Sequence, residues 1–242
     1  MPRKTKGRQD RHTAGRSERT DHMKFSYAIF DMDGLMFDTE NLFVRAFEEA
    51  IGPEIGYRFS REKMKQLIGL NHQAELETFP RLFPGCPASG ETCMNRLRAW
   101  MRDYIRENGI PVKPGLRTLL AWLKEQGVSC AVATSTDTKV AKSYLENAGI
   151  TAYFQTITGG DQVTRSKPDP EIFHLAMRAL GQSEPAKGVV FEDSRNGLLA
   201  GARGGFSVIV VPDLLDPTLE FPALCYAKCA RLDEAIAVIQ NS

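Results

Sequence analysis

The chain has 242 residues, of which 42% are hydrophobic and 25% are charged, and this composition predicts a globular protein with a sizeable core. No apolar run approaches the roughly twenty residues of a membrane-spanning helix, and the amino terminus lacks the apolar middle region of a secretory signal, so we expect a cytoplasmic protein with no membrane partner. The five cysteines form no CxxC pair and their odd number does not suggest a disulfide framework, so we expect reduced thiols.

Residues 1–22 have a different character, with seven basic and three acidic residues and almost no apolar side chains. Removing these from the 31 basic and 30 acidic residues of the whole chain leaves 24 and 27, so the rest carries a net charge of about −3 at pH 7. Such a tail is expected to be disordered. It lacks the aromatics or basic helical face of a nucleic-acid arm, so no nucleic-acid partner is expected. Met23 stands before the first predicted strand, and we hypothesise that it is the native start or that the tail is dispensable.

The run from Tyr27 to Phe30 is short and apolar, which predicts a buried strand, and it leads into Asp31, Asp33 and Gly34. Gly34 permits a sharp turn, so the two carboxylates are expected at the carboxyl end of the strand. Side chains alternate along a strand, so residues two apart can face one site, where two carboxylates repel each other unless a cation lies between them. The pattern therefore predicts a divalent metal site, although paired acids also occur as ordinary turn residues.

Helical spacing dominates the next segment, and no strand is evident there. The expected helices cover residues 42–51, ending at Gly52-Pro53, then a stretch capped by Ser60, then 74–79 and 94–105. We expect residues 38–108 to form a helical domain inserted after the first strand. Both of its ends lie beside the predicted carboxylate site, which is the position of a lid.

From about residue 111 the pattern alternates between strands and helices. Strands are expected over 128–133, 154–158, 188–191 and 207–211, with helices between them and a closing helix over 233–239. This order indicates an α/β core of residues 23–37 and 109–242, built as a Rossmann-like, doubly wound parallel sheet.

Polar side chains follow four of these strands or lie just beyond them. They are Asp31 with Asp33, Thr134 with Ser135, Lys167, and Glu192 with Asp193. The carboxyl ends of parallel strands meet at one edge of a sheet, so these groups are expected to assemble in one crevice.

In this order and spacing, the segments DMDGLMFDTE, ATST, SKPDP and VVFEDSRNG resemble the haloacid dehalogenase superfamily of aspartyl phosphotransferases. The resemblance extends from Met23 to Ser242 and is to the branch with a helical cap after the first motif, which includes phosphosugar phosphatases and β-phosphoglucomutase.

By this resemblance Asp31 is the nucleophile, and Asp33 is the acid that protonates the leaving group and then the base that activates water. The resemblance also implies a Mg²⁺ site formed by Asp31, the backbone carbonyl of Asp33 and Asp193, with Glu192 acting through a bound water. Lys167, Thr134 and Ser135 are expected to bind the phosphate, since phosphoryl transfer spreads negative charge over its oxygens.

Hydrolysis of a small phosphomonoester, of the sugar phosphate or nucleotide class, is the expected reaction. A dehalogenase would leave Asp33 without a role, and a phosphonatase needs a cap lysine, for which Lys63 and Lys65 are not in a convincing setting. The resembling mutases have an arginine after the cap's glycine turn, where this chain has His72, and a histidine where this chain has Phe43. A phosphosugar mutase is therefore the alternative.

Specificity is expected to rest on Thr39, Asn71 and His72, although Thr39 can also cap the first lid helix and His72 can be an ordinary helix-start histidine. A more remote alternative is a phosphoacceptor switch or a silent binding protein, but such a switch domain has roughly 120 residues and no inserted lid. The expected partner is a small phosphorylated metabolite, and the expected assembly is a monomer or a weak dimer.

Overall fold

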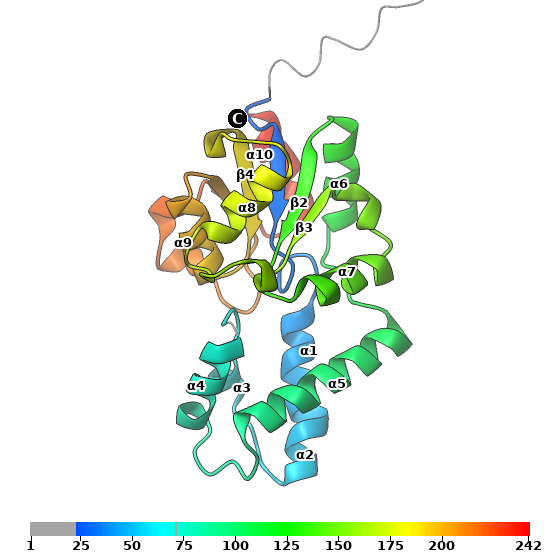
Figure 1. The fold of residues 1–242 in the computed structure, drawn as a ribbon, viewed down its shortest axis with the longest axis vertical. Helices are drawn as coiled ribbons and strands as arrows, with labels where there is room; N and C mark the ends of the chain where they lie inside the picture. The colour runs from blue at the N-terminus through cyan, green and yellow to red at the C-terminus, as the bar shows by residue number, and fades with distance from the viewer. Residues whose placement is uncertain (1–22, 71) are drawn as a thin grey trace, which may run out of the picture.

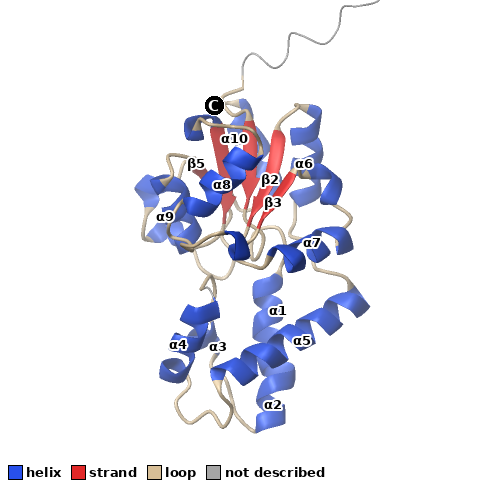
Figure 2. Ribbon diagram, in the orientation of Figure 1, coloured by secondary structure: helices blue, strands red, loops and turns tan. Residues whose placement is uncertain are grey.

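A computed structural model describes residues 23–70 and 72–242, so the predicted tail of residues 1–22 and the predicted specificity residue Asn71 lie outside the described residues. Six parallel strands form one sheet in the order β3-β2-β1-β4-β5-β6 (Figures 1 and 2). The strands are β1 (Tyr27–Phe30), β2 (Ser129–Ala133), β3 (Thr156–Thr158), β4 (Gly188–Glu192), β5 (Ser207–Val210) and β6 (Ala227–Lys228). This order is that of a doubly wound sheet, which confirms the predicted fold class.

Two helical layers cover the sheet because alternate residues of its buried strands point to opposite faces. Ala28 and Phe30 of β1 pack in one apolar cluster with α6 (Leu116–Glu125), α7 (Thr138–Asn147) and α10 (Ala235–Gln240). Tyr27 and Ile29 pack in a second cluster with α8 (Glu171–Ala179) and α9 (Arg195–Arg203). Short 3₁₀ turns occupy Thr151–Tyr153, Gly160–Gln162, Pro185–Lys187, Pro217–Leu219, Pro222–Leu224 and Leu232–Glu234.

The residues between β1 and α6 form a separate group of helices at the carboxyl edge of the sheet (Figure 1), here called the helical lobe. They are α1 (Thr39–Ala46), a π-helical turn (Phe47–Ile51), α2 (Gly52–Ile55), α3 (Arg61–Met64), α4 (His72–Leu82) and α5 (Gly90–Asn108). The lobe has its own apolar cluster, in which Phe47, Phe59 and Phe79 lie in mutual ring contact. Among the described residues of the lobe there is no strand, as expected.

The prediction that Gly52-Pro53 ends the first lobe helix was wrong. The Gly52 N–H donates to the Phe47 carbonyl in a π turn, and the chain stays helical to Ile55. Pro53 directly follows the π turn as the second residue of α2, and its fixed φ is compatible with a helix. The helix ends instead at Gly56, whose φ of 65° is in the left-handed region that glycine adopts readily.

Two backbone connections between the lobe and the core lie side by side. Phe37 pairs with Val112 in an antiparallel bridge, and the Asp38 N–H donates to the Pro111 carbonyl at 2.9 Å. Beside them, Lys113 Nζ lies 2.6 Å from Asp213 Oδ1 in the loop after β5. The chain therefore leaves and re-enters the core at one place next to the carboxyl end of β1.

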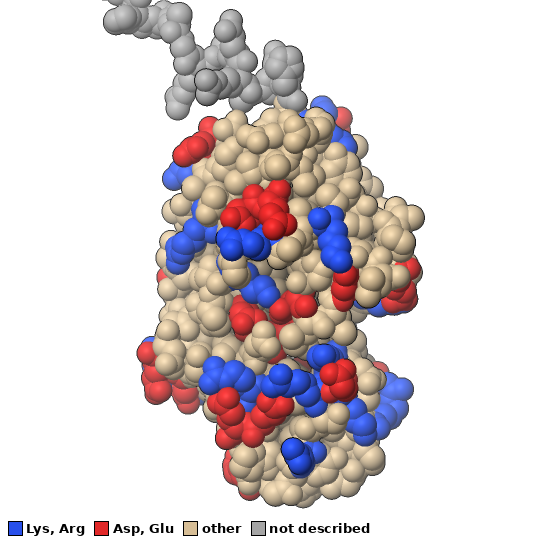
Figure 3. Space-filling model, turned by 180° about the vertical axis from the view of Figure 1, so that it is seen from behind, with Lys and Arg blue, Asp and Glu red and all other residues tan. Residues whose placement is uncertain are grey.

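The strand β6 was not predicted, since Ala227–Lys228 is only two residues long and has no apolar run. All five cysteines are free thiols, as expected. No helix in the described part of the chain is both long and apolar enough to cross a bilayer. On the face drawn in Figure 3, basic and acidic side chains of the described residues adjoin over the helical lobe, and ion pairs in the lobe include Arg61 with Glu48 at 2.7 Å.

Candidate active site

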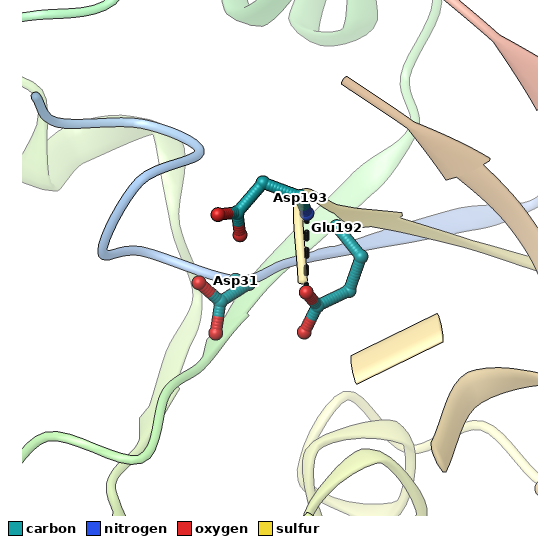
Figure 4. A group of neighbouring side chains, drawn as sticks. All are labelled: Asp31, Glu192 and Asp193. Atoms are coloured by element: carbon teal, nitrogen blue, oxygen red, sulfur yellow. Dashed lines mark hydrogen bonds between the residues drawn. The ribbon is translucent and has the colours of Figure 1, made fainter. Parts of the chain in front are cut away.

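Three carboxylates gather where β1 and β4 end, at the centre of the sheet (Figure 4). Asp31 follows β1, Glu192 is the last residue of β4 and Asp193 comes next, and each offers an oxygen within 4.8 Å of the other two. We call these residues the acidic cluster; all three are buried. Strands β1 and β4 are neighbours in the sheet, so the cluster forms where ligands bind in doubly wound folds.

Lys167 enters the acidic cluster from the loop before α8. Its ammonium lies 2.5 Å from Asp31 Oδ1 and 2.6 Å from Glu192 Oε1, and it donates to the Ala133 carbonyl at 3.1 Å. Burial alone would lower the pKa of Lys167, but the two carboxylates outweigh burial and raise it, so the lysine is charged. This ammonium therefore bonds two of the three buried carboxyl groups, Asp31 and Glu192.

The single positive charge of Lys167 does not balance the three carboxyl groups of the acidic cluster. Burial raises the pKa of Asp31 to about 8 against the opposing effect of Lys167, and burial with neighbouring acids raises the pKa of Asp193 well above its usual range. Asp193 Oδ1 is buried with no hydrogen-bond partner among the described residues. Hard oxygen donors with an unpaired buried oxygen and excess negative charge fit a divalent cation such as Mg²⁺.

Glu192 is fixed by donors on every side. Its Oε2 accepts hydrogen bonds from the N–H groups of Asp193 and Ser194 at 3.1 and 3.2 Å, and from Ser194 Oγ at 3.0 Å. Gly197, in the first turn of α9, leaves the space for this carboxylate, because a Cβ there would lie far closer to it than 3.0 Å. Gly197 has no positive φ, so what this glycine provides is room and not an unusual backbone conformation.

Asp33 lies in a ring of hydroxyl groups. Its Oδ1 accepts from Thr39 Oγ1 at 2.9 Å, and its Oδ2 accepts from Thr136 Oγ1 at 2.7 Å and Thr134 Oγ1 at 3.3 Å. Thr134 also accepts from the Thr136 N–H at 3.1 Å. Thr136 was not among the predicted site residues, although its place in the run Thr134-Ser135-Thr136 was an available signal.

A cavity of about 980 Å³ opens between the core and the helical lobe above these groups. Its floor carries the predicted residues Asp31, Asp33, Thr134, Ser135, Lys167 and Asp193, and Thr39 and His72 line it from the lobe. Glu192 lies beneath the floor. Three arginines of α5 also line the cavity, Arg98, Arg102 and Arg106, and these were not predicted as site residues.

The residues Asp38, Thr39 and Glu40 do not cap the first lobe helix with their side chains. Asp38 occupies the cap position without bonding a backbone N–H, and it accepts instead from Asn41 Nδ2 at 2.7 Å. Thr39 reaches Asp33, and Glu40 is buried near Asp213. Asp137, in contrast, caps α7, because it accepts from the Lys139 N–H at 2.9 Å.

A family model described as haloacid dehalogenase-like hydrolase matches residues 28–211. The chain is similar to a phosphorylated carbohydrates phosphatase of Thermotoga maritima, at 32% identity over 187 residues that cover 75% of this chain and 82% of that protein. It is also similar to a probable pseudouridine-5'-phosphatase of Drosophila melanogaster, at 31% identity over 223 residues that cover 90% of this chain and 91% of that protein.

Among solved structures, a putative beta-phosphoglucomutase from Thermotoga maritima matches with a TM-score of 0.73 and 28% identity, covering 90% of this chain and 99% of that chain. The span matched by the family model begins within β1 and ends just after β5, so it contains the whole acidic cluster, Lys167 and the helical lobe.

Proposed function

The chain belongs to the haloacid dehalogenase-like hydrolases, and on that premise we propose that it is a Mg²⁺-dependent phosphatase acting on a small phosphomonoester through an aspartyl phosphate. The observation that carries the proposal is the pairing of two unlike aspartates on the cavity floor. Asp31 lies against Lys167 and beside the carboxylates of Glu192 and Asp193, whereas Asp33 is surrounded by hydroxyls. Phosphatase is also the name of both relatives described above, each more than 30% identical.

Asp31 attacks phosphorus, so that a bond forms from its carboxylate oxygen while the bond to the leaving oxygen breaks. Asp33, protonated at this point, gives its proton to the leaving oxygen. A water then attacks the aspartyl phosphate, Asp33 takes the water's proton, and the bond between phosphorus and the Asp31 oxygen breaks. Phosphate leaves, and both aspartates return to their starting states.

Lys167 orients the Asp31 oxygen and supplies positive charge to the phosphate, and Thr134 and Ser135 supply hydroxyl groups beside it. Asp31, Asp193 and the backbone carbonyl of Asp33 would hold Mg²⁺. When bound, the ion offsets the charge that develops on the phosphate oxygens during transfer.

Glu192 would approach this ion only through a water. Its Oε1 already accepts from Lys167, and its Oε2 accepts from Ser194 and from the Asp193 N–H. We assign it the role of a positioning residue, which holds Lys167 and the first turn of α9 in place.

A phosphosugar mutase is the second candidate, and the match to the putative beta-phosphoglucomutase favours it. A mutase must bind a second phosphate on the substrate and keep water away from the aspartyl phosphate. The proposed phosphatase only needs to admit water. Incubation with β-glucose 1-phosphate and glucose 1,6-bisphosphate separates the two, since turnover confined to that pair indicates the mutase.

The test of the phosphatase is release of inorganic phosphate from para-nitrophenyl phosphate with Mg²⁺, followed by a panel of sugar phosphates and nucleotides. We expect activity that EDTA removes and Mg²⁺ restores, and that Asp31→Asn abolishes. Equal turnover in Asp31→Asn would refute the mechanism. Mg²⁺-dependent turnover that needs Asp31 would also exclude the phosphoacceptor switch and the silent binding protein.

A further inference from the structure

The wall of the cavity opposite the acidic cluster carries a row of arginines. Arg98, Arg102 and Arg106 are spaced four residues apart on α5, so they lie one above another along one side of that helix. They directly follow Leu97, Met101 and Ile105, which lie toward the apolar side of α5, and all three arginines line the same cavity as Asp31. The arginine row therefore borders the cavity beside the apolar side of α5.

The charges of the first two arginines are weakly compensated. Arg98 donates to Asn95 Oδ1 at 3.0 Å and to His72 Nδ1 at 2.7 Å, and neither of these contacts is with a carboxylate. Arg102 has its nearest described carboxylate, Asp103, at 4.0 Å, in a pair that is largely exposed to solvent.

Arg106 differs from the other two. It pairs with Asp103 at 2.9 Å and with Glu107 at 3.4 Å, so neighbouring carboxylates already balance its charge. The positive charge available to a ligand is therefore at Arg98 and Arg102.

The acids around this wall do not cancel that charge. Among the described residues that the lobe contributes to the cavity, the acidic ones are Glu40, which lies against Asp213, and Glu75. Burial raises the pKa of Glu75 to about 7 against the opposing effect of Arg98, so a large part of it is neutral near pH 7. Asp137 and Asp161 line the core side, where each accepts hydrogen bonds at the start of α7.

We propose that Arg98 and Arg102 bind a second anionic group of the substrate, a phosphate or a carboxylate, while the reacting phosphate lies on the floor beside Asp31. The proposal rests on the proposed function for the place of the reacting phosphate. A cavity of about 980 Å³ is far larger than one phosphate requires, and it leaves room for a carbon chain between two anions. Guanidinium groups suit this task because their planar donors match phosphate and carboxylate oxygens.

The test measures binding to the Asp31→Asn protein in Mg²⁺ by calorimetry, so that turnover is not needed. The three probes each have six carbons and a phosphate. Glucose 6-phosphate carries no second anion, glucose 1,6-bisphosphate carries a second phosphate, and 6-phosphogluconate carries a carboxylate. We expect at least one two-anion probe to bind about tenfold or more tightly than glucose 6-phosphate. The preferred probe tells which anion the site takes.

In the double variant Arg98→Gln, Arg102→Gln we expect this preference to disappear. Arg96→Gln is the control for loss of an arginine charge from the same helix, at a residue paired with Glu54 outside the cavity. Arg102→Glu is a second variant, which reverses the charge at a side chain that is 72% exposed, so little packing is lost. It should weaken binding of the two-anion probe at least as much as the double variant does. Melting temperatures check that each variant is folded.

Two results would overturn the proposal: no tighter binding of either two-anion probe, or a preference that survives in both arginine variants. Failure of the phosphatase itself gives a different pattern. In that case para-nitrophenyl phosphate is not hydrolysed by the wild-type protein, while the binding preference and its dependence on Arg98 and Arg102 persist.

Discussion

Replacing Gly197 with alanine adds one methyl group beneath the active site. The added Cβ would overlap the Glu192 carboxylate, which is fully buried and held by several donors. Because Gly197 begins the interior of α9, helix propensity alone predicts that alanine stabilises the protein by about 1 kcal/mol. The structure predicts the opposite sign, since either the carboxylate or the helix must move.

The expected size follows from two losses. Overpacking a buried site costs about 1–3 kcal/mol, and displacing Glu192 weakens its hydrogen bond to Lys167 at 2.6 Å, worth about 1.5–3 kcal/mol for a charged pair. After the propensity gain, a net destabilisation of about 1.5–5 kcal/mol remains. Lys167 also holds Asp31, so kcat is expected to fall by about tenfold or more, with a smaller change in KM.

Urea unfolding and phosphatase kinetics measure the two effects separately. Gly201→Ala is the matched control, because in the same helix its Cβ would approach the Val208 side chain at 2.6 Å and would not touch the acidic cluster. It should lose stability while keeping kcat. If Gly197→Ala is as stable as the wild type and fully active, the assignment of Gly197 as space for Glu192 is wrong.

Three further predictions concern the charged floor. Mg²⁺ should raise the melting temperature more at pH 8.5 than at pH 5.5. The pKa of Asp31 is about 8 in the folded protein against an ordinary value of 3.8, so the folded state binds this proton more tightly and the metal-free protein loses stability as the pH rises between those values. At low pH, protons also compete with the ion for Asp31. An equal gain at both pH values contradicts this. Thr136→Val should lower kcat about tenfold or more by removing its hydrogen bond to Asp33, with recovery in Thr136→Ser. Thr151→Val, whose buried hydroxyl has no partner among the described residues, should leave kcat unchanged. Lys167→Met should abolish turnover and, in EDTA at pH 8, lower the free energy of unfolding by about 3–5 kcal/mol; urea titration should show a smaller loss at pH 5.5, where Asp31 is protonated.

Motif spacing in the sequence predicted the groups that meet at the sheet edge. A parallel sheet brings the carboxyl ends of its strands to one edge, whatever the intervening sequence is. Asp31 and Asp193 each follow a strand at this edge, and Lys167 reaches Asp31 from a loop there. Thr136 was missed because a hydroxyl two residues beyond a strand has many ordinary roles. Only its 2.7 Å contact with Asp33 distinguishes it.

The sequence by itself determined the α/β class, the place of the helical insertion and the main carboxylates, because strand periodicity and turn residues act over short stretches of chain. Only the tertiary structure decided which lobe residues face those carboxylates. Arg98 and Arg102 look like ordinary surface arginines of a helix until α5 packs over the carboxyl edge of the sheet, and Gly197 looks like any helix-start glycine until Glu192 fills the space beside it. Contacts between elements far apart in sequence depend on packing of whole layers, which no local pattern records.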